Sequence, residues 1–300
     1  AEEGVDFIYF DGVMGESCGC DIASAELMAD SLRRLGNGMY LISSWGLPAE
    51  GEECSFDAWS RLAPYVRVGP DTSDTWEGSV VGSAIYDSFS EYTRLIAPKI
   101  GPHHFGDLAG TMIGKVHCHE GSEGCPPGPN YYIPSNQSAL TKDEVISHIS
   151  MTAIFRSSWW AMGVLSEMDD FMFKTLTNEA LLRITMMSHG TRQVMDVHSP
   201  SFHGPGIVWT SDDDVEAWKY VLLVNLCICP DASPCMGLCP ASGQSEVEVD
   251  FKQLGLSPAT TCDMTELWEN EALGKVTGTV KAALRPHASL LVKLSHCKEL

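Results

Sequence analysis

Three aspartates follow short apolar segments of the chain, where carboxylates can do chemistry. Asp11 ends the run Val5 to Phe10, Asp71 comes shortly after Tyr65 to Val68, and Asp107 ends another short strand-like segment. Carboxyl groups at the ends of parallel strands can act as nucleophiles or as general acids and bases. The alternative for Asp11 is a loop aspartate that caps the helix that follows. Which chemistry applies depends on the elements that place these side chains.

The run before Asp11 has the character of a buried parallel strand. It carries four apolar residues between two glycines, namely Val5, Phe7, Ile8 and Phe10 between Gly4 and Gly12. A nearly continuous apolar run of this length suits a parallel strand that is covered on both faces. Asp11 is then expected at the carboxyl tip of the strand, which is the end where a (β/α)8 barrel builds its active site.

Strands and helices are predicted to alternate through the first two thirds of the chain. In order, the segments are Ile22 to Leu35 (helix), Met39 to Ser43 (strand), Phe56 to Leu62 (helix), Tyr65 to Val68 (strand) and Ser83 to Ala97 (helix). Thr141 to Glu144 has the pattern of a capping box, which predicts a helix start. Trp159 to Leu165 is apolar enough for a last barrel strand, and Asp169 or Asp170 can cap a helix that runs on past Leu176. This alternation predicts βα units of a barrel.

The pattern changes beyond Val194. Short alternating strands follow, with turns rich in Gly, Pro, Ser and Asp between them, at Ile207 to Thr210, Trp218 to Leu226, Val247 to Phe251 and Ala288 to Leu294. Helical periodicity is missing from this part. The sequence therefore predicts an α/β fold of two domains, with residues 1–195 forming part of a (β/α)8 barrel and residues 196–300 an antiparallel β-sandwich.

Composition argues against several classes of partner. Forty Asp and Glu residues against nineteen Lys and Arg give a formal net charge of −21, which disfavours nucleic acid and anionic membrane surfaces. No run reaches the roughly 18 to 20 apolar residues of a membrane span. The first residues lack a signal-peptide pattern, so any targeting sequence is expected upstream or already removed.

Eleven cysteines, several of them closely spaced, indicate disulfides. The best local pairs are Cys118 with Cys125 and pairs within the cluster Cys227 to Cys239. Asn136 begins an N-glycosylation acceptor, so we expect a secreted, extracellular or luminal protein. A zinc site at His117 to His119 with Cys125, or at the Cys227 cluster, is the alternative. Neither has the paired spacing typical of zinc sites, so we expect no metal, and no cofactor is indicated.

Several segments together resemble glycoside hydrolase family 27, the α-galactosidase or melibiase family, and its bacterial and plant branch more than the animal lysosomal enzymes. They are Gly4 to Asp11, Arg67 to Trp76, Leu140 to Ser157, Asp169 to Phe171, Leu176 to Glu179, Gly190 to Gln193 and Asp263 to Trp268. The resemblance implies a barrel followed by a β-sandwich. It also implies a retaining hydrolase of terminal α-galactosyl or α-N-acetylgalactosaminyl residues, with a carbohydrate as the substrate partner.

The resemblance implies roles for five residues. Asp11 would be the nucleophile and Asp71 the general acid/base, two carboxyl groups that retaining enzymes hold about 5 to 5.5 Å apart. Asp71 would be protonated while Asp11 is charged, the usual division between neighbouring carboxyl groups. Arg67 would bind sugar hydroxyls or keep the nucleophile ionised. The Trp76 ring would form a wall of the site beside the general acid/base, and Asp107 would bind substrate.

The chain also departs from the family. Tyr9 replaces a lysine that contacts substrate hydroxyls, and Ala109 replaces the second acid of a Trp-x-Asp-x-Asp-Met segment. The sequence begins at what would be the fourth barrel strand, and half a barrel cannot close. A cleaved upstream fragment or a separate chain is expected to complete it, unless the sequence is incomplete or the fold recut. These departures favour the alternative, a catalytically degenerate glycosidase fold that serves as a glycan-binding or structural subunit of an extracellular assembly.

Overall fold

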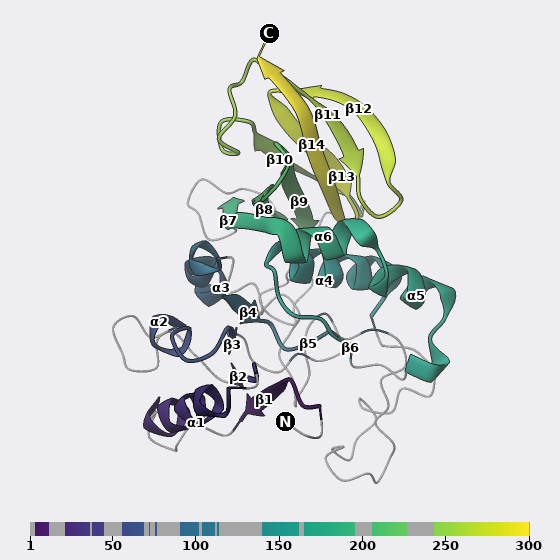
Figure 1. Ribbon diagram of the computed structural model, residues 1–300. Coiled ribbons are helices and arrows are strands. Elements are labelled where there is room, and N and C mark those ends of the chain that lie inside the picture. The colour runs from purple at the N-terminus through teal and green to yellow at the C-terminus, as the bar shows by residue number, and fades with distance from the viewer. Residues whose placement is uncertain are drawn as a thin grey trace.

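The computed structural model describes residues 4–11, 22–36, 38–44, 56–68, 72, 76, 91–101, 104–111, 113, 140–161, 165–195, 206–226 and 243–299. Helices and short parallel strands make up the N-terminal part, and antiparallel strands make up the C-terminal part (Figure 1). Among these residues no helix is long and apolar enough to cross a membrane. The fold class predicted from the sequence, a partial (β/α)8 barrel followed by a β-sandwich, is confirmed.

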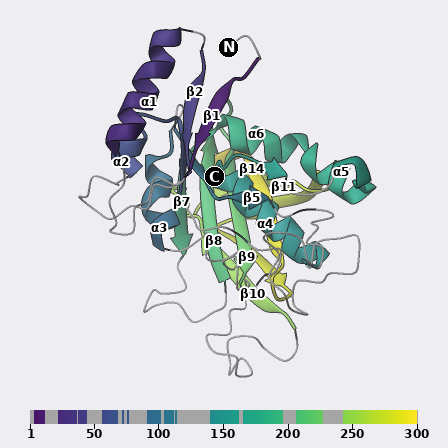
Figure 2. The same ribbon diagram turned by 90° about the horizontal axis from the view of Figure 1, so that it is seen from below.

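Four short parallel strands form one sheet in the order β1-β2-β3-β4. Their bounds are Phe7–Phe10, Tyr40–Ser43, Tyr65–Arg67 and Phe105–Asp107. A second parallel pair joins β5 (Gly110–Thr111) to β6 (Trp160–Ala161), the latter within the predicted last strand. Figure 2 shows β1 beside β2, with the helix that connects them alongside. The strand ends of this sheet are where the predicted site residues lie.

Alternate residues of these strands serve different faces. Ile8, Phe10 and Val66 pack in the core that includes the surrounding helices. The opposite side, here called the inner face, begins with a row of aromatic rings that are the first residues of their strands, namely Phe7, Tyr40, Tyr65 and Phe105. Successive ring centroids are 6.0, 6.2 and 4.8 Å apart. The row marks the amino end of the inner face, so residues two and four positions later approach its carboxyl end.

Three helices accompany the sheet. Helix α1 (Ile22–Leu35) has the predicted bounds and buries Ala25, Ala29 and Leu32 against the core. Helix α2 (Phe56–Trp59) is shorter than the predicted segment to Leu62. Helix α3 (Glu91–Ile96) runs into the 3-10 turn η2 (Ala97–Lys99).

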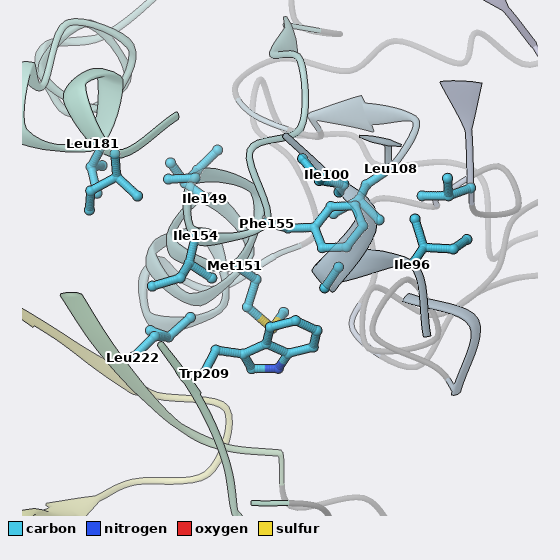
Figure 3. Packing of buried hydrophobic residues seen from close by; sticks show 14 of the residues in the cluster. Ile96, Ile100, Leu108, Ile149, Met151, Ile154, Phe155, Leu181, Trp209 and Leu222 are labelled. Atoms are coloured by element: carbon cyan, nitrogen blue, oxygen red, sulfur yellow. The ribbon is translucent and has the colours of Figure 1, made fainter. Parts of the chain in front are cut away.

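Helix α4 (Lys142–Ile154) lies between the parallel sheet and the sandwich. Its predicted capping box is confirmed, because Thr141 accepts from the Glu144 N–H and the Glu144 side chain accepts from the Thr141 N–H. Residues on every side of the helix are buried, as expected of a helix covered all round. Figure 3 shows Phe155, just beyond its end, and Trp209 of the sandwich in the same cluster, with ring centroids 6.2 Å apart.

Two short helices replace the single one predicted to run past Leu176. After the 3-10 turn η3 (Leu165–Glu167), helix α5 (Asp170–Leu176) starts at its predicted cap Asp169 and ends at Leu176. The Asn178 side chain then accepts from two backbone N–H groups and starts α6 (Glu179–Met187). The prediction of one continuous helix was wrong, because the first helix ends at Leu176 and Asn178 caps a second one.

The C-terminal part has a six-stranded sheet, in the order β12-β11-β14-β9-β8-β7, and a two-stranded sheet, β10-β13. Their bounds are β7 Ser188–Met195, β8 Gly206–Asp213, β9 Lys219–Asn225, β10 Ser245–Asp250, β11 Thr260–Glu266, β12 Glu271–Thr277, β13 Thr279–Leu284 and β14 Ser289–Glu299. All pairings are antiparallel. Strands β8 and β9 are buried on both faces: Val208 and Val221 belong to the sandwich core, whereas Trp209 and Leu222 belong to the core around α4.

Strand β7 follows α6 directly and pairs with β8. It therefore belongs to the six-stranded sheet although it precedes residue 196. The division of the chain into domains 1–195 and 196–300 stays a prediction.

A disulfide joins Cys262 of β11 to Cys297 of β14, two neighbouring strands. It supports the prediction that the cysteines form disulfides, although this pair was not singled out from the sequence. The other nine cysteines, the Asn136 acceptor and both alternative zinc clusters lie outside the described residues.

Candidate active site

Three of the five predicted site residues lie at the carboxyl ends of parallel strands. Asp11 directly follows β1 and is exposed, whereas Arg67 and Asp107 are the last residues of β3 and β4 and pair with each other in register. Asp71 lies outside the described residues. Trp76 packs against Leu226 and His287 of the C-terminal part.

Arg67 is nearly buried and connects two strands of the inner face. Its Nη1 donates a hydrogen bond of 3.3 Å to the phenol oxygen of Tyr9. Tyr9 is two residues after Phe7, and Arg67 is two residues after Tyr65, so both side chains follow the aromatic row by one step along their strands. The cation therefore lies within reach of both β1 and β4, the strands that end in Asp11 and Asp107.

Asp107 is a buried carboxyl group with 1% exposure. Burial raises the pKa of its carboxyl above the ordinary value, and the charge of Arg67 and the Ala109 N–H offset this only in part. Ala109 has a positive φ of 70°, so the chain turns back and its N–H donates to Asp107 Oδ1 at 2.9 Å. This left-handed turn separates β4 from β5. The backbone N–H of Ala109 thus fixes the Asp107 carboxyl group.

The other oxygen, Asp107 Oδ2, is buried and has no partner at hydrogen-bonding geometry within the described part of the chain. The Ser158 hydroxyl and the Trp160 indole are near enough to lower the pKa of Asp107. The indole N–H itself donates to Ser158 Oγ at 2.7 Å. Oδ2 is therefore a buried acceptor whose hydrogen-bonding capacity the described residues leave unused.

Gly106 lets β4 lie close to the end of α4. A Cβ at this position would meet the Phe155 ring at 2.6 Å and the Ile100 side chain at 3.1 Å. A side chain there would push β4 away and displace Asp107, the next residue. The absence of a side chain at Gly106 thus allows the Asp107 carboxyl group to lie where it does, buried next to the end of α4.

Trp160 brings β6 toward the inner face of β1. Its ring lies edge-on to Phe7 and Tyr9, with centroid distances of 5.9 and 5.6 Å. The sequence predicted this tryptophan only as part of the last barrel strand, Trp159 to Leu165. Its contacts place it beside Tyr9, and Ser158 joins it near Asp107.

Trp76 contacts the sandwich. Its indole is 2% exposed, its Nε1–H donates to the Leu226 carbonyl oxygen at 3.3 Å, and its ring stacks on His287 with centroids 4.7 Å apart. No sequence signal pointed to His287, which lies in the other domain. The predicted role of Trp76 as a wall beside the acid stays a prediction.

Comparisons with known proteins place these observations in a family context. Residues 204–294 match the family model of the α-galactosidase C-terminal β-sandwich domain. A search of curated proteins finds no match.

Solved structures cover nearly the whole chain. A GH27 β-L-arabinopyranosidase from Geobacillus stearothermophilus superposes with a TM-score of 0.77 at 26% identity, covering 98% of this chain and 58% of that one. A protein from Bacillus halodurans, described as an unconfirmed α-N-acetylgalactosaminidase, superposes with a TM-score of 0.67 at 20% identity, covering 97% of this chain and 58% of that one. The α-galactosidase of Saccharomyces cerevisiae, solved with raffinose, superposes with a TM-score of 0.69 at 13% identity, covering 98% of this chain and 73% of that one.

The chain spans less than three fifths of the length of the GH27 arabinopyranosidase it matches. The matched part contains parallel βα units and the antiparallel sandwich that follows them. Residues 204–294 are therefore a β-sandwich of the α-galactosidase C-terminal type, and the chain as a whole is similar in fold to the GH27 arabinopyranosidase, with part of a (β/α)8 barrel ahead of that sandwich.

Proposed function

We propose that this chain carries the chemistry of a retaining glycosidase that acts on terminal α-galactosyl or α-N-acetylgalactosaminyl residues of glycans. The observation that supports it most is the cluster at the strand ends of the inner face, where Arg67 and Asp107 are paired in register and Arg67 reaches Tyr9 on the strand that ends in Asp11. Charged and polar groups at the carboxyl ends of parallel barrel strands are the usual setting of catalysis in this fold.

In this proposal Asp11 attacks the anomeric carbon and Asp71 gives its proton to the departing oxygen. A covalent glycosyl ester forms on Asp11. Asp71, now a carboxylate, takes a proton from water, which hydrolyses the ester with overall retention. Arg67 donates to sugar hydroxyl oxygens, and Asp107 Oδ2 accepts a hydrogen bond from a sugar hydroxyl.

The substrate class rests on the similar proteins. Their names refer to a β-L-arabinopyranoside, an α-N-acetylgalactosaminide and an α-galactoside. The ring hydroxyls of L-arabinopyranose have the configuration of those of galactose, without the hydroxymethyl group. A comparison of aryl glycosides of these three sugars would rank them for this chain.

The proposal is tested by Asp11→Asn and Asp71→Asn, assayed with an aryl α-galactoside and with any upstream fragment that accompanies the native protein. Each substitution should reduce turnover by at least ~10² to 10⁴-fold, the usual size of an acid/base contribution. Asp30→Asn, an exposed carboxyl of α1, is the control and should keep full activity. A 2-fluoro galactosyl trapping reagent should label Asp11, and labelling elsewhere would contradict the assignment.

The departures from the family support a second candidate, a glycan-binding or structural subunit without turnover. Tyr9 in place of a lysine removes one cation, and Arg67 already donates a hydrogen bond to its phenol oxygen. In this case the native protein would bind galactosides, measured by calorimetry, but would not hydrolyse an activated aryl galactoside.

We also propose that an upstream fragment or a separate chain covers the open side of the barrel, in an extracellular or luminal compartment. In the described part of the chain Val5, Phe7 and Tyr40 expose more than a third of their surface near the β1 edge. Bare apolar strand edges favour aggregation. Native mass spectrometry of purified protein should show the additional mass, and the Cys262–Cys297 disulfide fits an oxidising compartment.

A further inference from the structure

The end of helix α4 holds the chain on both sides of Asp107. The residue before it, Gly106, lies so close to the Phe155 ring that an added Cβ would meet the ring at 2.6 Å. The residue after it, Leu108, donates its N–H to Ser157 Oγ at 2.9 Å. Both sequence neighbours of Asp107 are therefore fixed by the few residues that follow α4.

The Ser157 hydroxyl is buried, and both of its hydrogen-bonding roles are in use. It donates to the Ser158 carbonyl oxygen at 3.2 Å, which leaves its lone pairs for the Leu108 N–H. The chain turns away directly afterwards, at Ala109 with its positive φ of 70°. A buried N–H without an acceptor costs free energy. The Ser157 hydroxyl therefore holds Leu108 in place just before the turn.

The backbone of Ser157 is itself fixed by the way α4 ends. The Ser157 N–H donates to the Thr152 carbonyl oxygen and the Arg156 N–H to the Ala153 carbonyl oxygen, each at 3.0 Å. Arg156, between the helix and Ser157, has a φ of 61°. Two such bonds around a left-handed residue form a Schellman motif, in which glycine is more usual. The place of Ser157 thus follows from the helix cap.

This helix cap is held in turn by α6 and β7. Thr191 Oγ1 of β7 donates to the Ile154 carbonyl oxygen at 2.9 Å, and Arg156 Nε donates to the Thr185 carbonyl oxygen of α6 at 3.1 Å. These bonds join the residues just before Ser157 to elements other than β4. The serine is therefore a fixed point against which the end of β4 is placed.

We propose that Ser157 is a positioning residue for Asp107, acting through the Leu108 backbone. It fixes the chain just after Asp107, while the contact of Gly106 with Phe155 fixes it just before, so the carboxyl group keeps its buried place at the end of β4. This inference rests on the proposed function for what Asp107 does and deepens it, because it names the group that keeps the carboxyl in place. Ser157 touches no substrate in this scheme.

A positioning role differs from simple packing in its effect on the titration of Asp107. Burial is the largest influence on this carboxyl group and raises its pKa, against the charge of Arg67 and the Ala109 N–H. Release of the chain after Asp107 would let water reach the carboxyl group, so its pKa would fall toward the ordinary value of about 4. A serine that only fills space would change the free energy of unfolding equally at every pH.

The test compares Ser157→Ala with Ser150→Ala in the full native protein. Ser150 is an equally buried serine of α4, and its hydroxyl accepts the Trp268 indole N–H at 2.8 Å, away from β4. Each variant is also combined with Asp107→Asn. The stability difference within each pair, from urea unfolding at a series of pH values, gives the pKa of Asp107. We expect this pKa to be lower in Ser157→Ala and unchanged in Ser150→Ala.

Enzyme kinetics give a second readout. With an aryl α-galactoside, kcat/KM should fall in Ser157→Ala by up to ~10²-fold, as a misplacement of about 1 Å can cause. It should stay at the wild-type value in Ser150→Ala. In the Asp107→Asn background, Ser157→Ala should cause little further loss, because it acts through the carboxyl group already removed.

A pKa of Asp107 that stays the same or rises in Ser157→Ala would overturn the positioning role. If Ser157→Ala does not fold, Ser157→Cys replaces it, since a thiol is close in shape and accepts hydrogen bonds only weakly. The proposed function fails separately. If the pKa falls but Asp107→Asn leaves binding and turnover of the galactoside unchanged, the positioning role stands and the proposed role of Asp107 in sugar binding is wrong. If Asp107→Asn lowers activity and Ser157→Ala changes neither the pKa nor kcat/KM, only the inference is wrong.

Discussion

Arg67 donates a hydrogen bond from its Nη1 to the phenol oxygen of Tyr9, 3.3 Å away, and thereby reaches from β3 across β2 to β1. The resemblance to glycoside hydrolase family 27 implies a lysine at the position of Tyr9. Two neighbouring cations would repel, whereas a phenol oxygen accepts from a guanidinium. The exchange of lysine for tyrosine therefore changes the electrostatics around the proposed nucleophile as well as its contacts.

Tyr9→Phe removes this acceptor and leaves the ring against Trp160. The free energy of unfolding should change by less than about 1.5 kcal/mol, as for a typical hydrogen bond. KM for an aryl galactoside should rise more than kcat falls, because Arg67 loses the group that orients it. Tyr40→Phe is the control, since Tyr40 is as exposed as Tyr9 at 37% and lies on the next strand. Equal kinetic effects of both variants would contradict the orienting role of Tyr9.

Asp107→Asn should make the protein more stable at neutral pH and less active. Burial raises the pKa of Asp107 in the folded protein, so folding favours the protonated carboxyl group. The stability that this gives is fully present below the unfolded-state pKa of about 4 and is lost as pH rises through the folded-state pKa. Relative to wild type, the asparagine variant should gain stability as pH rises above about 4, measured by urea unfolding at a series of pH values. Its kcat/KM should fall about 10- to 100-fold, the loss of one charge-assisted hydrogen bond. A stability difference independent of pH would be the contrary result.

Arg183→Leu should destabilise the protein by about 2–4 kcal/mol, because it leaves a buried carboxylate without its cation. Arg183 donates to both oxygens of Asp213, at 2.7 and 2.8 Å, and Tyr220 donates at 2.6 Å. Burial would raise the pKa of Asp213, but these hydrogen bonds hold it well below the ordinary range. The stabilisation is therefore present above about pH 4 and lost as pH falls through the folded pKa. Lys281→Ala, in the exposed pair with Glu246, should cost under about 1 kcal/mol.

Replacing both Cys262 and Cys297 by alanine should lower the free energy of unfolding by about 3–4 kcal/mol, by the chain-entropy estimate for a loop of this length. The two residues are 35 apart in sequence. Guanidinium unfolding followed by far-UV circular dichroism would measure the change. A reductant added to the wild-type protein should lower the free energy of unfolding at least as much, and a reductant effect that remains in the double variant would report the other predicted disulfides.

Local sequence signals predicted the elements they control directly. Helix α1 has the predicted bounds because its apolar spacing and the glycines after it act within a few residues. The capping box of α4 needs only Thr141 and Glu144. The break after Leu176 was missed because Asn178 can continue a polar helix face as well as cap a new helix.

The site could be predicted in part for the same reason. Arg67 and Asp107 lie at the ends of short apolar strands, and such ends can be recognised in the sequence from the residues that break a strand, such as Gly69 and Pro70 after β3. The stacking of Trp76 on His287 depends on how two domains pack, and residues so far apart carry no shared periodic signal. The turn at Ala109 was equally hidden, because alanine does not favour a positive φ and the hydrogen bond to the Asp107 carboxylate that accompanies it is a feature of the folded chain.

The direct passage from Met187 of α6 to Ser188 of β7 has a consequence for exchanging parts between related enzymes. Thr191 of β7 donates to the Ile154 carbonyl oxygen at the end of α4, and Arg183 of α6 binds Asp213 of β8. A chimaera cut at residues 196–205 would strip an edge strand from the six-stranded sheet and leave it on the foreign barrel. The unit that keeps this sheet whole begins before α6, at the Asn178 cap, so a chimaera joined there should fold better than one joined at the boundary that composition suggests.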